Sequence, residues 1–545
     1  MATKITSALI LAPVLASALT LSACGGGGSS TQPKPPPPPP PPSALVRVSA
    51  ASPFATGCGG SMQGSILYEN AEVEPFVAIN PGNPANIIGV WQQDRWSDGG
   101  AHGIVAGASF DDGKTWHLHP LLLSQCAGGN AGNGADYARA SDPWVTISPN
   151  ATAYAISISF TGNTFQQGSR GAVLVVTSSD GGQTWGNPTA LIVDGSNAFN
   201  DKESIAADPN DSDYVYAVWD RLTTANTGAA TMARSTDGGQ TWEAARSIYD
   251  PGVNNQTINN QIAVLPDGTV VDFYTEIDNA FQGTPSAFMA VVRSTDHGVN
   301  WSAPIKIADV DSIGTFDPET GQQVRAGADL GQITAGAAGE LAVVWQDARF
   351  SGGERDDVLF TQSADGGLSW PAPVEINGDP DVQAFEPAVS IRADGRIGVS
   401  YYDFRNDTSD PGTLPTDYWL TQSTDGTHWQ ESHISGSFDL DLAPNAEGLF
   451  TGDYQGIGSE DDLGFVPFFV QTTGDGTSNR TDVYILPPGT ANAARALTVE
   501  ARAFPAGTAV KMTPEFRSRV QAALLDLLRE EIPGRGENPP SPEQP

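Results

Sequence analysis

The chain has 545 residues, of which 39% are hydrophobic and 17% are charged, so it can bury a sizeable core. Its formal net charge of -36 repels phosphate backbones, which excludes nucleic acid as a partner. The 60 glycines and 41 prolines favour many short strands joined by tight turns, and therefore an all-β fold.

The N-terminus has the pattern of an export signal. Lys4 precedes an apolar run from Ala8 to Leu21, which is too short to span a membrane. The run ends in Leu-Ser-Ala-Cys, which resembles the bacterial lipobox, whose cysteine is acylated. We expect residues 1–23 to be a lipoprotein signal peptide and Cys24 to carry the lipid. An ordinary signal peptide with a free cysteine is the alternative. By analogy with Gram-negative sorting, Gly25 points to the outer membrane, facing the periplasm or the cell surface.

Residues 24–43 are a tether. A Gly/Ser stretch is followed by Pro35–Pro42, which should form a stiff polyproline II rod that holds the body away from the membrane. We expect the lipid to be the only membrane contact and the body to be a monomer. Cys58 and Cys126 are the remaining cysteines, and in an exported body they predict one disulfide. Metal binding is the weaker alternative.

An eight-residue phrase recurs through the body, most clearly as "STDGGQTW", and begins at Ser109, Ser178, Ser235, Ser294, Ser363 and Ser423. Each interval holds the same four strand-like stretches. In the first repeat they are residues 74–80, 87–94, 103–110 and 117–123. Four short strands at a fixed repeat predict a blade of a β-propeller.

The phrase itself suits a tight turn between the third and fourth strands. Its Asp accepts backbone hydrogen bonds, its Gly allows positive φ, and its Trp packs beside the hairpin. We therefore expect a structural role for its aspartates, which are Asp111, Asp180, Asp237, Asp296, Asp365 and Asp425.

These phrases resemble the Asp-box, or BNR, repeats of the sialidase (neuraminidase) superfamily of β-propellers, and the resemblance covers about residues 44–486. In that family the boxes lie on the face opposite the active site. The resemblance therefore implies a propeller over residues 44–490 and an exo-sialidase-like glycoside hydrolase. The first-blade Arg-Ile-Pro motif of true sialidases is absent, and no motif places their tyrosine nucleophile.

Strand-like sequence continues past the sixth phrase in "GLFTGDYQGIG", "GFVPFFVQTT" and "TDVYILP". With residues 44–50 as an outer strand, it predicts a seventh four-stranded blade that closes the ring. Six blades with an added hairpin is the alternative. Residues 491–532 are predicted to form an extension with an amphipathic helix that starts near Thr513 and docks on the propeller through Val520, Leu524, Leu527 and Ile532. Residues 533–545 should be disordered.

The face opposite the phrases carries the starts of the first strands, where carboxylates recur. Clustered carboxylates raise one another's pKa values, as general acids require, and they also bind hard cations. Capping at blade junctions is the structural alternative. No cofactor is required, and Ca²⁺ is an optional ligand. The predicted catalytic residues are Asp142, Glu203, Glu386, Asp453 and Tyr454, and Glu74 shares this position as a substrate-binding residue.

Arginines follow the second strands in Asp-Arg or Asp-x-Arg pairs. A guanidinium fork suits a substrate carboxylate, although ion pairing with the adjacent Asp is the structural alternative. The predicted substrate-binding arginines are Arg95, Arg221, Arg349 and Arg405. The sequence thus predicts an exported, lipid-anchored, sialidase-like glycoside hydrolase acting on extracellular or periplasmic glycans. A non-catalytic propeller that binds glycan or protein is the alternative.

Overall fold

The computed structural model describes residues 45–59, 64–460, 464–473, 480–490, 497–505 and 511–531. The predicted signal peptide, the lipidation at Cys24, most of the tether, Ile532 and the tail at 533–545 lie outside these ranges. The described elements are strands, one 3-10 turn and one α-helix, so the all-β prediction with a C-terminal helix is confirmed. Within the described ranges, no helix combines the length and apolar character needed to span a membrane.

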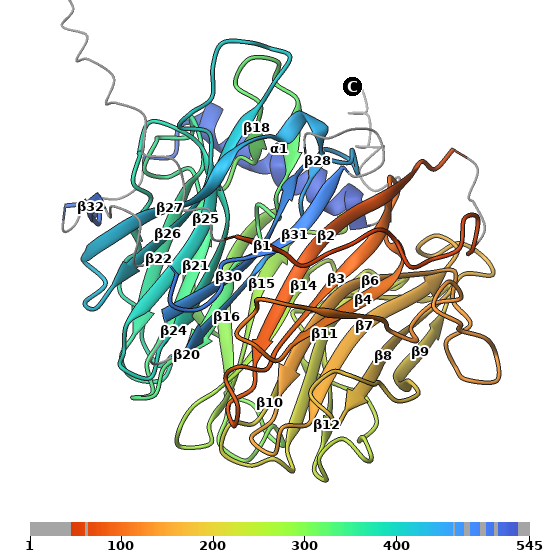
Figure 1. The fold of residues 1–545 in the computed structure, drawn as a ribbon. Coiled ribbons are helices and arrows are strands. Elements are labelled where there is room, and N and C mark those ends of the chain that lie inside the picture. The colour runs from red at the N-terminus through yellow and green to blue at the C-terminus, as the bar shows by residue number, and fades with distance from the viewer. Residues whose placement is uncertain are drawn as a thin grey trace, which may run out of the picture. The chain divides into compact units, whose positions relative to one another are not determined.

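The strands pair antiparallel in sets of four (Figure 1). The first set is β2 (Leu67–Ile79), β3 (Ile87–Trp96), β4 (Ala101–Ser109) and β5 (His117–Pro120). The second is β6 (Arg139–Ile147), β7 (Ala153–Thr161), β8 (Arg170–Ser178) and β9 (Thr189–Gly195). The third is β10 (Ala198–Ala207), β11 (Val215–Thr223), β12 (Thr227–Ser235) and β13 (Arg246–Tyr249).

Further sets follow in chain order. They are β14 (Gln256–Val264), β15 (Val270–Asp278), β16 (Ser286–Ser294) and β17 (Ile305–Val310); then β20 (Gln332–Ala335), β21 (Leu341–Asp347), β22 (Asp357–Ser363) and β23 (Val374–Glu375). Next come β24 (Ala384–Ile391), β25 (Ile397–Asp403), β26 (Pro415–Ser423) and β27 (His428–Asp439), which the 3-10 turn Leu440–Leu442 follows. The last set has β29 (Gly456–Glu460), β30 (Gly464–Thr472) and β31 (Thr481–Ile485).

The sets close into a ring. The first strand of each set packs beside the first strand of the next, and β29 packs beside β2. The N-terminal strand β1 (Val46–Arg47) pairs antiparallel with β31, so the two ends of the propeller sequence meet in the last set, as predicted. Sets of four antiparallel strands around a closed ring of inner strands form a β-propeller.

The repeated phrases form the turns between third and fourth strands. In the third copy, Asp237 accepts hydrogen bonds from the Thr241 amide (2.8 Å) and hydroxyl (2.6 Å) and from the Ser235 hydroxyl (2.8 Å). These bonds hold the pKa of Asp237 below its ordinary value. The sixth copy is one residue shorter, and there the His428 amide donates to Asp425 instead. The carboxylates of the phrase are therefore engaged in holding the turn.

The phrases and the first-strand carboxylates lie at opposite ends of the strands. In the first set, Ser109 of the phrase pairs with Ile87, and Ile87 pairs with Ile79 at the end of β2. Arg95, near the end of β3, lies beside the start of β2. The strand pairing thus confirms the prediction that the phrases and the first-strand carboxylates lie on opposite faces of the propeller.

Each of five inner strands contains a bulge where a non-glycine residue takes positive φ. These residues are Glu74, Asp142, Lys202, Asn259 and Glu386, with φ between 47° and 64°. The pairing register shifts at each of them. A bulge re-aims a side chain, and a non-glycine left-handed residue is strained, so such sites are characteristic of functional regions.

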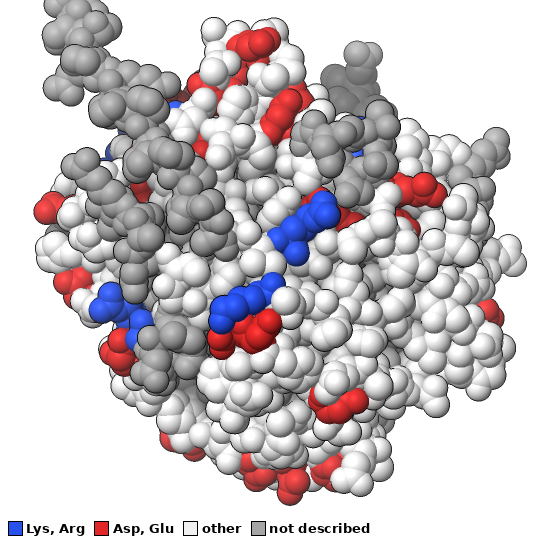
Figure 2. Space-filling view, viewed as in Figure 1, with Lys and Arg blue, Asp and Glu red and all other residues white. Residues whose placement is uncertain are grey.

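Two additions lie near the bulge end. A small sheet is formed by β18 (Thr315–Phe316), β19 (Gln323–Arg325) and β28 (Leu449–Phe450), in which Arg325 pairs with Phe450. Figure 1 shows this sheet and helix α1 (Pro514–Glu531) at the same end of the strand sets. The predicted extension also supplies β32 (Leu497–Glu500), which pairs with β27 and had no sequence signal. Figure 2 shows separate patches of Asp and Glu over one face, with few Lys and Arg.

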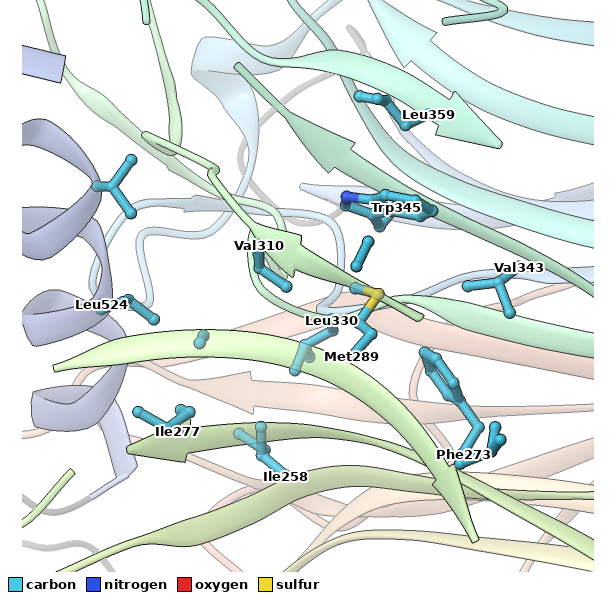
Figure 3. Packing of buried hydrophobic residues seen from close by; sticks show 14 of the residues in the cluster. Ile258, Phe273, Ile277, Met289, Val310, Leu330, Val343, Trp345, Leu359 and Leu524 are labelled. Atoms are coloured by element: carbon cyan, nitrogen blue, oxygen red, sulfur yellow. The ribbon is translucent and has the colours of Figure 1, made fainter. Parts of the chain in front are cut away.

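Helix α1 docks by an apolar stripe. The Thr513 hydroxyl accepts a hydrogen bond from the Phe516 amide, which caps the helix start. Phe516, Val520, Leu524 and Leu528 are buried in one cluster with strands β14 to β22. Figure 3 shows Leu524 reaching from the helix toward Val310 and Ile277. The docking is as predicted, although Leu527 is only partly buried.

Replacing Leu524 with alanine should destabilise the fold by about 2–5 kcal/mol, because it leaves a cavity under the helix. Leu524 is 0% exposed. Urea unfolding followed by tryptophan fluorescence measures the loss. The control is Leu368→Ala, at a position that is 56% exposed, where little change is expected. Equal unfolding midpoints for the two variants would contradict the docking.

Candidate functional site

A cavity of about 280 Å³ opens at the bulge end of the ring. Bulge residues of three adjacent inner strands line it, together with Arg95 from β3. The small sheet contributes Arg325, the turn before β29 contributes Asp453, and helix α1 contributes Leu527. The three bulge residues in the lining are Glu74, Asp142 and Lys202.

Lys202 lies at the centre of the charged groups. Its ammonium nitrogen is 2.8 Å from Asp142 Oδ1, 2.6 Å from Asp453 Oδ2 and 3.9 Å from Glu74 Oε1. Burial acts to lower the pKa of Lys202, but the charges of Asp142 and Asp453 raise it well above its ordinary value. The side chain therefore remains an ammonium ion, which rules it out as a neutral amine nucleophile.

Asp453 is held by two cations. The Arg325 guanidinium donates from Nε at 3.0 Å and from Nη2 at 2.7 Å, and Lys202 donates from its other side. Burial would raise the pKa of Asp453, but Arg325 and Lys202 lower it far below its ordinary value. The ionised form of this carboxylate is therefore strongly favoured.

Glu74 has the opposite electrostatic environment. It is 1% exposed, and its carboxylate accepts a hydrogen bond from the Gln92 amide. Burial and the nearby charge of Asp142 raise its pKa to about 8. Two carboxyl groups whose pKa values are pushed apart in one cavity provide a proton donor beside an anion.

Two arginines of the cavity lining pack against the buried ring of Phe450. The guanidinium carbons of Arg95 and Arg325 each lie 4.7 Å from the ring centre of Phe450. Arg95 is 2% exposed and donates to Gln92 Oε1 at 2.8 Å. Because Gln92 also donates to Glu74, one amide aligns both an arginine and the high-pKa acid.

Three predicted catalytic residues do not line this cavity. Glu203 accepts a hydrogen bond from the Ile158 amide, and Glu386 accepts one from the Thr451 hydroxyl at 2.7 Å. The Tyr454 hydroxyl donates to the Pro143 carbonyl at 2.9 Å. Each is buried beneath the cavity and none lines it. The charge of Asp142 acts on Glu203 and Tyr454, and the charge of Asp453 acts on Glu386 and Tyr454, so all three lie behind the cavity carboxylates.

Three predicted substrate-binding arginines also lie elsewhere. Each forms ion pairs with carboxylates near its own strand. These arginines therefore match the structural alternative, ion pairing within the fold, rather than substrate binding. Arg221 binds Asp194 with two bonds of 2.9 and 2.7 Å. Arg349 binds Asp347 at 2.6 Å, and Arg405 binds Glu431 at 2.6 Å.

Lys202 and Arg325 were missed by sequence reasoning. Lys202 precedes Glu203, and comparison of carboxylates alone selected Glu203, although the bulge position belongs to Lys202. The sequence did contain a sign of this role, because Lys202 occupies the same position in its strand as Glu74 and Asp142 do in theirs. Arg325 comes from the small sheet inserted between β17 and β20, which lacks the repeat period, so no motif marked it.

Three of the cavity carboxylates are close enough together to hold a cation. One oxygen each from Glu74, Asp142 and Asp453 lies within 4.8 Å of the others. The Lys202 ammonium contacts this same group, so a positive charge is already supplied by the protein.

Residues 213–446 match the BNR repeat-like domain. No curated protein matches the chain. Among solved structures, the Hadza microbial sialidase Hz136 is 16% identical over 61% of this chain and 64% of its own, with a TM-score of 0.41. A Penicillium chrysogenum alpha-L-arabinanase complexed with arabinobiose is 13% identical over 66% and 93%, with a TM-score of 0.42. A Trypanosoma rangeli sialidase with 2,3-difluorosialic acid is 13% identical over 81% and 57%, with a TM-score of 0.41.

Proposed function

We propose that this chain, with its BNR repeat-like domain over residues 213–446, is a glycoside hydrolase whose active site is the cavity around Glu74, Asp142 and Asp453. The observation that carries the proposal is that one cavity holds two carboxyl groups in opposite settings: burial and Asp142 raise the pKa of Glu74 to about 8, whereas Arg325 and Lys202 lower the pKa of Asp453. Glycoside hydrolysis needs this combination of an acid and a carboxylate on either side of the bond that breaks.

Glu74 would donate its proton to the glycosidic oxygen as the bond to the sugar breaks. Asp142 and Asp453 would stabilise the positive charge that develops on the ring, or one of them would attack the anomeric carbon. Their oxygens lie within 4.8 Å of Glu74. This is closer to the separation of about 5–5.5 Å in retaining enzymes than to about 6.5–9.5 Å in inverting ones. We propose a retaining reaction, since oxygens no more than 4.8 Å apart leave little room for the water that an inverting enzyme places between its carboxyl groups.

The cations indicate what the sugar carries. Arg95 and Arg325 line the cavity, and guanidinium groups recognise carboxylates. We therefore infer an acidic sugar, bound with its carboxylate toward these arginines. Lys202 supplies the neutralising charge between the carboxylates, so the proposed reaction needs no Ca²⁺.

The wider setting is part of the same proposal. We infer a seven-bladed ring, because the four-stranded sets count to seven when β1 joins β29, β30 and β31. The lipobox-like ending at Cys24 and the tether support an exported, lipid-anchored enzyme of the outer membrane, acting on periplasmic or extracellular glycans. A disulfide joins Cys58 and Cys126, as expected for an exported body.

A panel of fluorogenic glycosides, including sialosides and uronides, tests the activity. The folded chain is expected to hydrolyse an acidic glycoside, and Asp142→Asn should reduce this at least about 100-fold, because the anion opposite the acid is lost. Chelation of divalent cations should leave the rate unchanged. A folded protein without turnover on any glycoside would reject the hydrolase.

A glycan-binding propeller is the second candidate. It is favoured by the pairing of Asp142 and Asp453 with Lys202 and Arg325, since a paired carboxylate is a weaker nucleophile. Calorimetry with acidic oligosaccharides separates the two. Saturable binding without turnover, lost in Arg325→Ala, would establish the binding function.

A further inference from the structure

A second cluster of chemically reactive groups lies apart from the cavity, around the disulfide. The Cα atoms of Cys58 and Cys126 are 5.2 Å apart across this bond. A ring nitrogen of His102 lies within 4.8 Å of both sulfurs. His102 comes from β4, the third strand of the first set, and is 1% exposed.

The imidazole of His102 is oriented by a carboxylate. Its Nδ1 lies 3.0 Å from Asp94 Oδ2, and because a carboxylate only accepts, we assign the neutral tautomer in which Nδ1–H donates this hydrogen bond. The other nitrogen, Nε2, is then left with its lone pair. It is buried and has no hydrogen-bond partner among the described residues. An imidazole held by a carboxylate, with its second nitrogen free, is the arrangement found in zinc-binding histidines.

We propose that reduction of the disulfide creates a zinc site from Cys58 Sγ, Cys126 Sγ and His102 Nε2. Two thiolates and an imidazole are ligands that Zn²⁺ prefers, and a water would complete a tetrahedron. With Zn–S bonds of about 2.3 Å and a Zn–N bond of about 2.0 Å, the ligand atoms lie roughly 3.3–3.8 Å apart. The two sulfurs need only separate from bonding distance to reach this spacing.

The segments that carry the cysteines are anchored independently of the disulfide. The Ser52 hydroxyl donates to Asp94 Oδ2 at 2.5 Å, and the Phe54 ring makes an edge contact with His102. The Ser124 hydroxyl donates to the His102 carbonyl at 2.6 Å. Both sulfurs should therefore stay near His102 after reduction. Cys58 and Cys126 are each partly exposed, so a reductant and an ion can reach them.

The chemistry balances with a trialkylphosphine as the reductant. The S–S bond accepts two electrons from phosphorus, which takes the oxygen of one water and becomes the phosphine oxide. The two protons of that water go to the sulfurs. Zn²⁺ then binds two thiolates and releases these two protons to solvent.

The test uses the untagged full chain with Cys24→Ser, so that only two thiols form. After phosphine reduction, titration with Co²⁺ should give one equivalent bound and a thiolate-to-cobalt charge-transfer absorbance. The oxidised chain should give neither. His102→Gln should weaken binding at least tenfold, and Asp94→Asn should weaken it about 10–100-fold. His117→Gln, at an exposed histidine of β5, is the matched control and should bind normally.

A reduced, folded chain that takes up no Co²⁺, or binds it equally well in His102→Gln, would overturn the proposal. A second measurement covers loss of fold in the variants. Zn²⁺ should slow alkylation of Cys58 and Cys126 in the reduced wild-type chain at least tenfold, as followed by mass spectrometry. If reduction itself unfolds the chain, Zn²⁺ should prevent that unfolding, and failure to do so would also overturn the site.

Discussion

Replacing Glu74 with glutamine is expected to lower kcat/KM toward glycosides with poor leaving groups by about 10²–10⁴-fold. The amide keeps the shape and the bond to Gln92 but has no proton of suitable acidity for the leaving oxygen. Aryl glycosides with acidic leaving groups need less protonation, so their rates should fall much less. Steady-state kinetics on a matched pair of substrates measures this difference.

Glu386→Gln is a closely matched control for this substitution. Both glutamates are bulge residues with φ of 52°, and they are 1% and 3% exposed. Glu386 also has a raised pKa, caused by burial, but it does not line the cavity. Its replacement should leave kcat/KM within about threefold of wild type. Equal losses in the two variants would indicate a structural role for the acid at this position.

The pKa of Glu74 also sets the pH profile. A general acid must be protonated, so activity should persist below about pH 8 and fall as the pH rises through that value. The same shift acts on stability. The unfolded chain releases this proton near pH 4.5 and the folded chain near pH 8, so stability falls as pH rises between them. Glu74→Gln should remove this contribution, as urea midpoints at several pH values would show.

Much of this fold could be predicted because the phrase repeats. The hydrogen bonds of Asp237 are local, so a short motif is enough to define the turn. Once the turn is placed, antiparallel pairing fixes which strand ends meet at the other face. That is why Asp142 and Asp453 could be placed at this face from the sequence, where both line the cavity, and why β1 was correctly paired with the last set.

The rest of the site depends on details that a repeat does not encode. A one-residue bulge decides whether Lys202 or Glu203 enters the cavity, and the side chains of neighbouring strand residues point to opposite faces. Arg325 arrives on an inserted sheet with no period of its own. Arg405 has the expected motif, but Asp403 and Glu431 bind it within its own set.

Lys202→Met should destabilise the protein by about 3–5 kcal/mol, because removing one partner of a buried ion pair leaves the Asp142 carboxylate without its cation. Lys202 is 8% exposed, and its ammonium contacts Asp142 and Asp453. Lys114→Met is the control, since Lys114 is exposed and pairs with Asp112 at the surface. It should leave the urea midpoint unchanged, and a similarly small effect of Lys202→Met would contradict a buried charge cluster.

The origin of that loss can be isolated by adding Asp142→Asn to Lys202→Met, because Asp142 loses its cation in that variant whereas Asp453 keeps Arg325. If the cost comes from an uncompensated carboxylate, the double variant should be more stable than the Lys202→Met variant, because one unpaired charge has been removed with its partner. Ca²⁺ should also restore part of the stability of Lys202→Met while leaving the wild type unchanged. The three carboxylate oxygens within 4.8 Å would then hold a metal ion in place of the ammonium. Additive losses and no response to Ca²⁺ would instead mean that Lys202 stabilises the ring through packing alone.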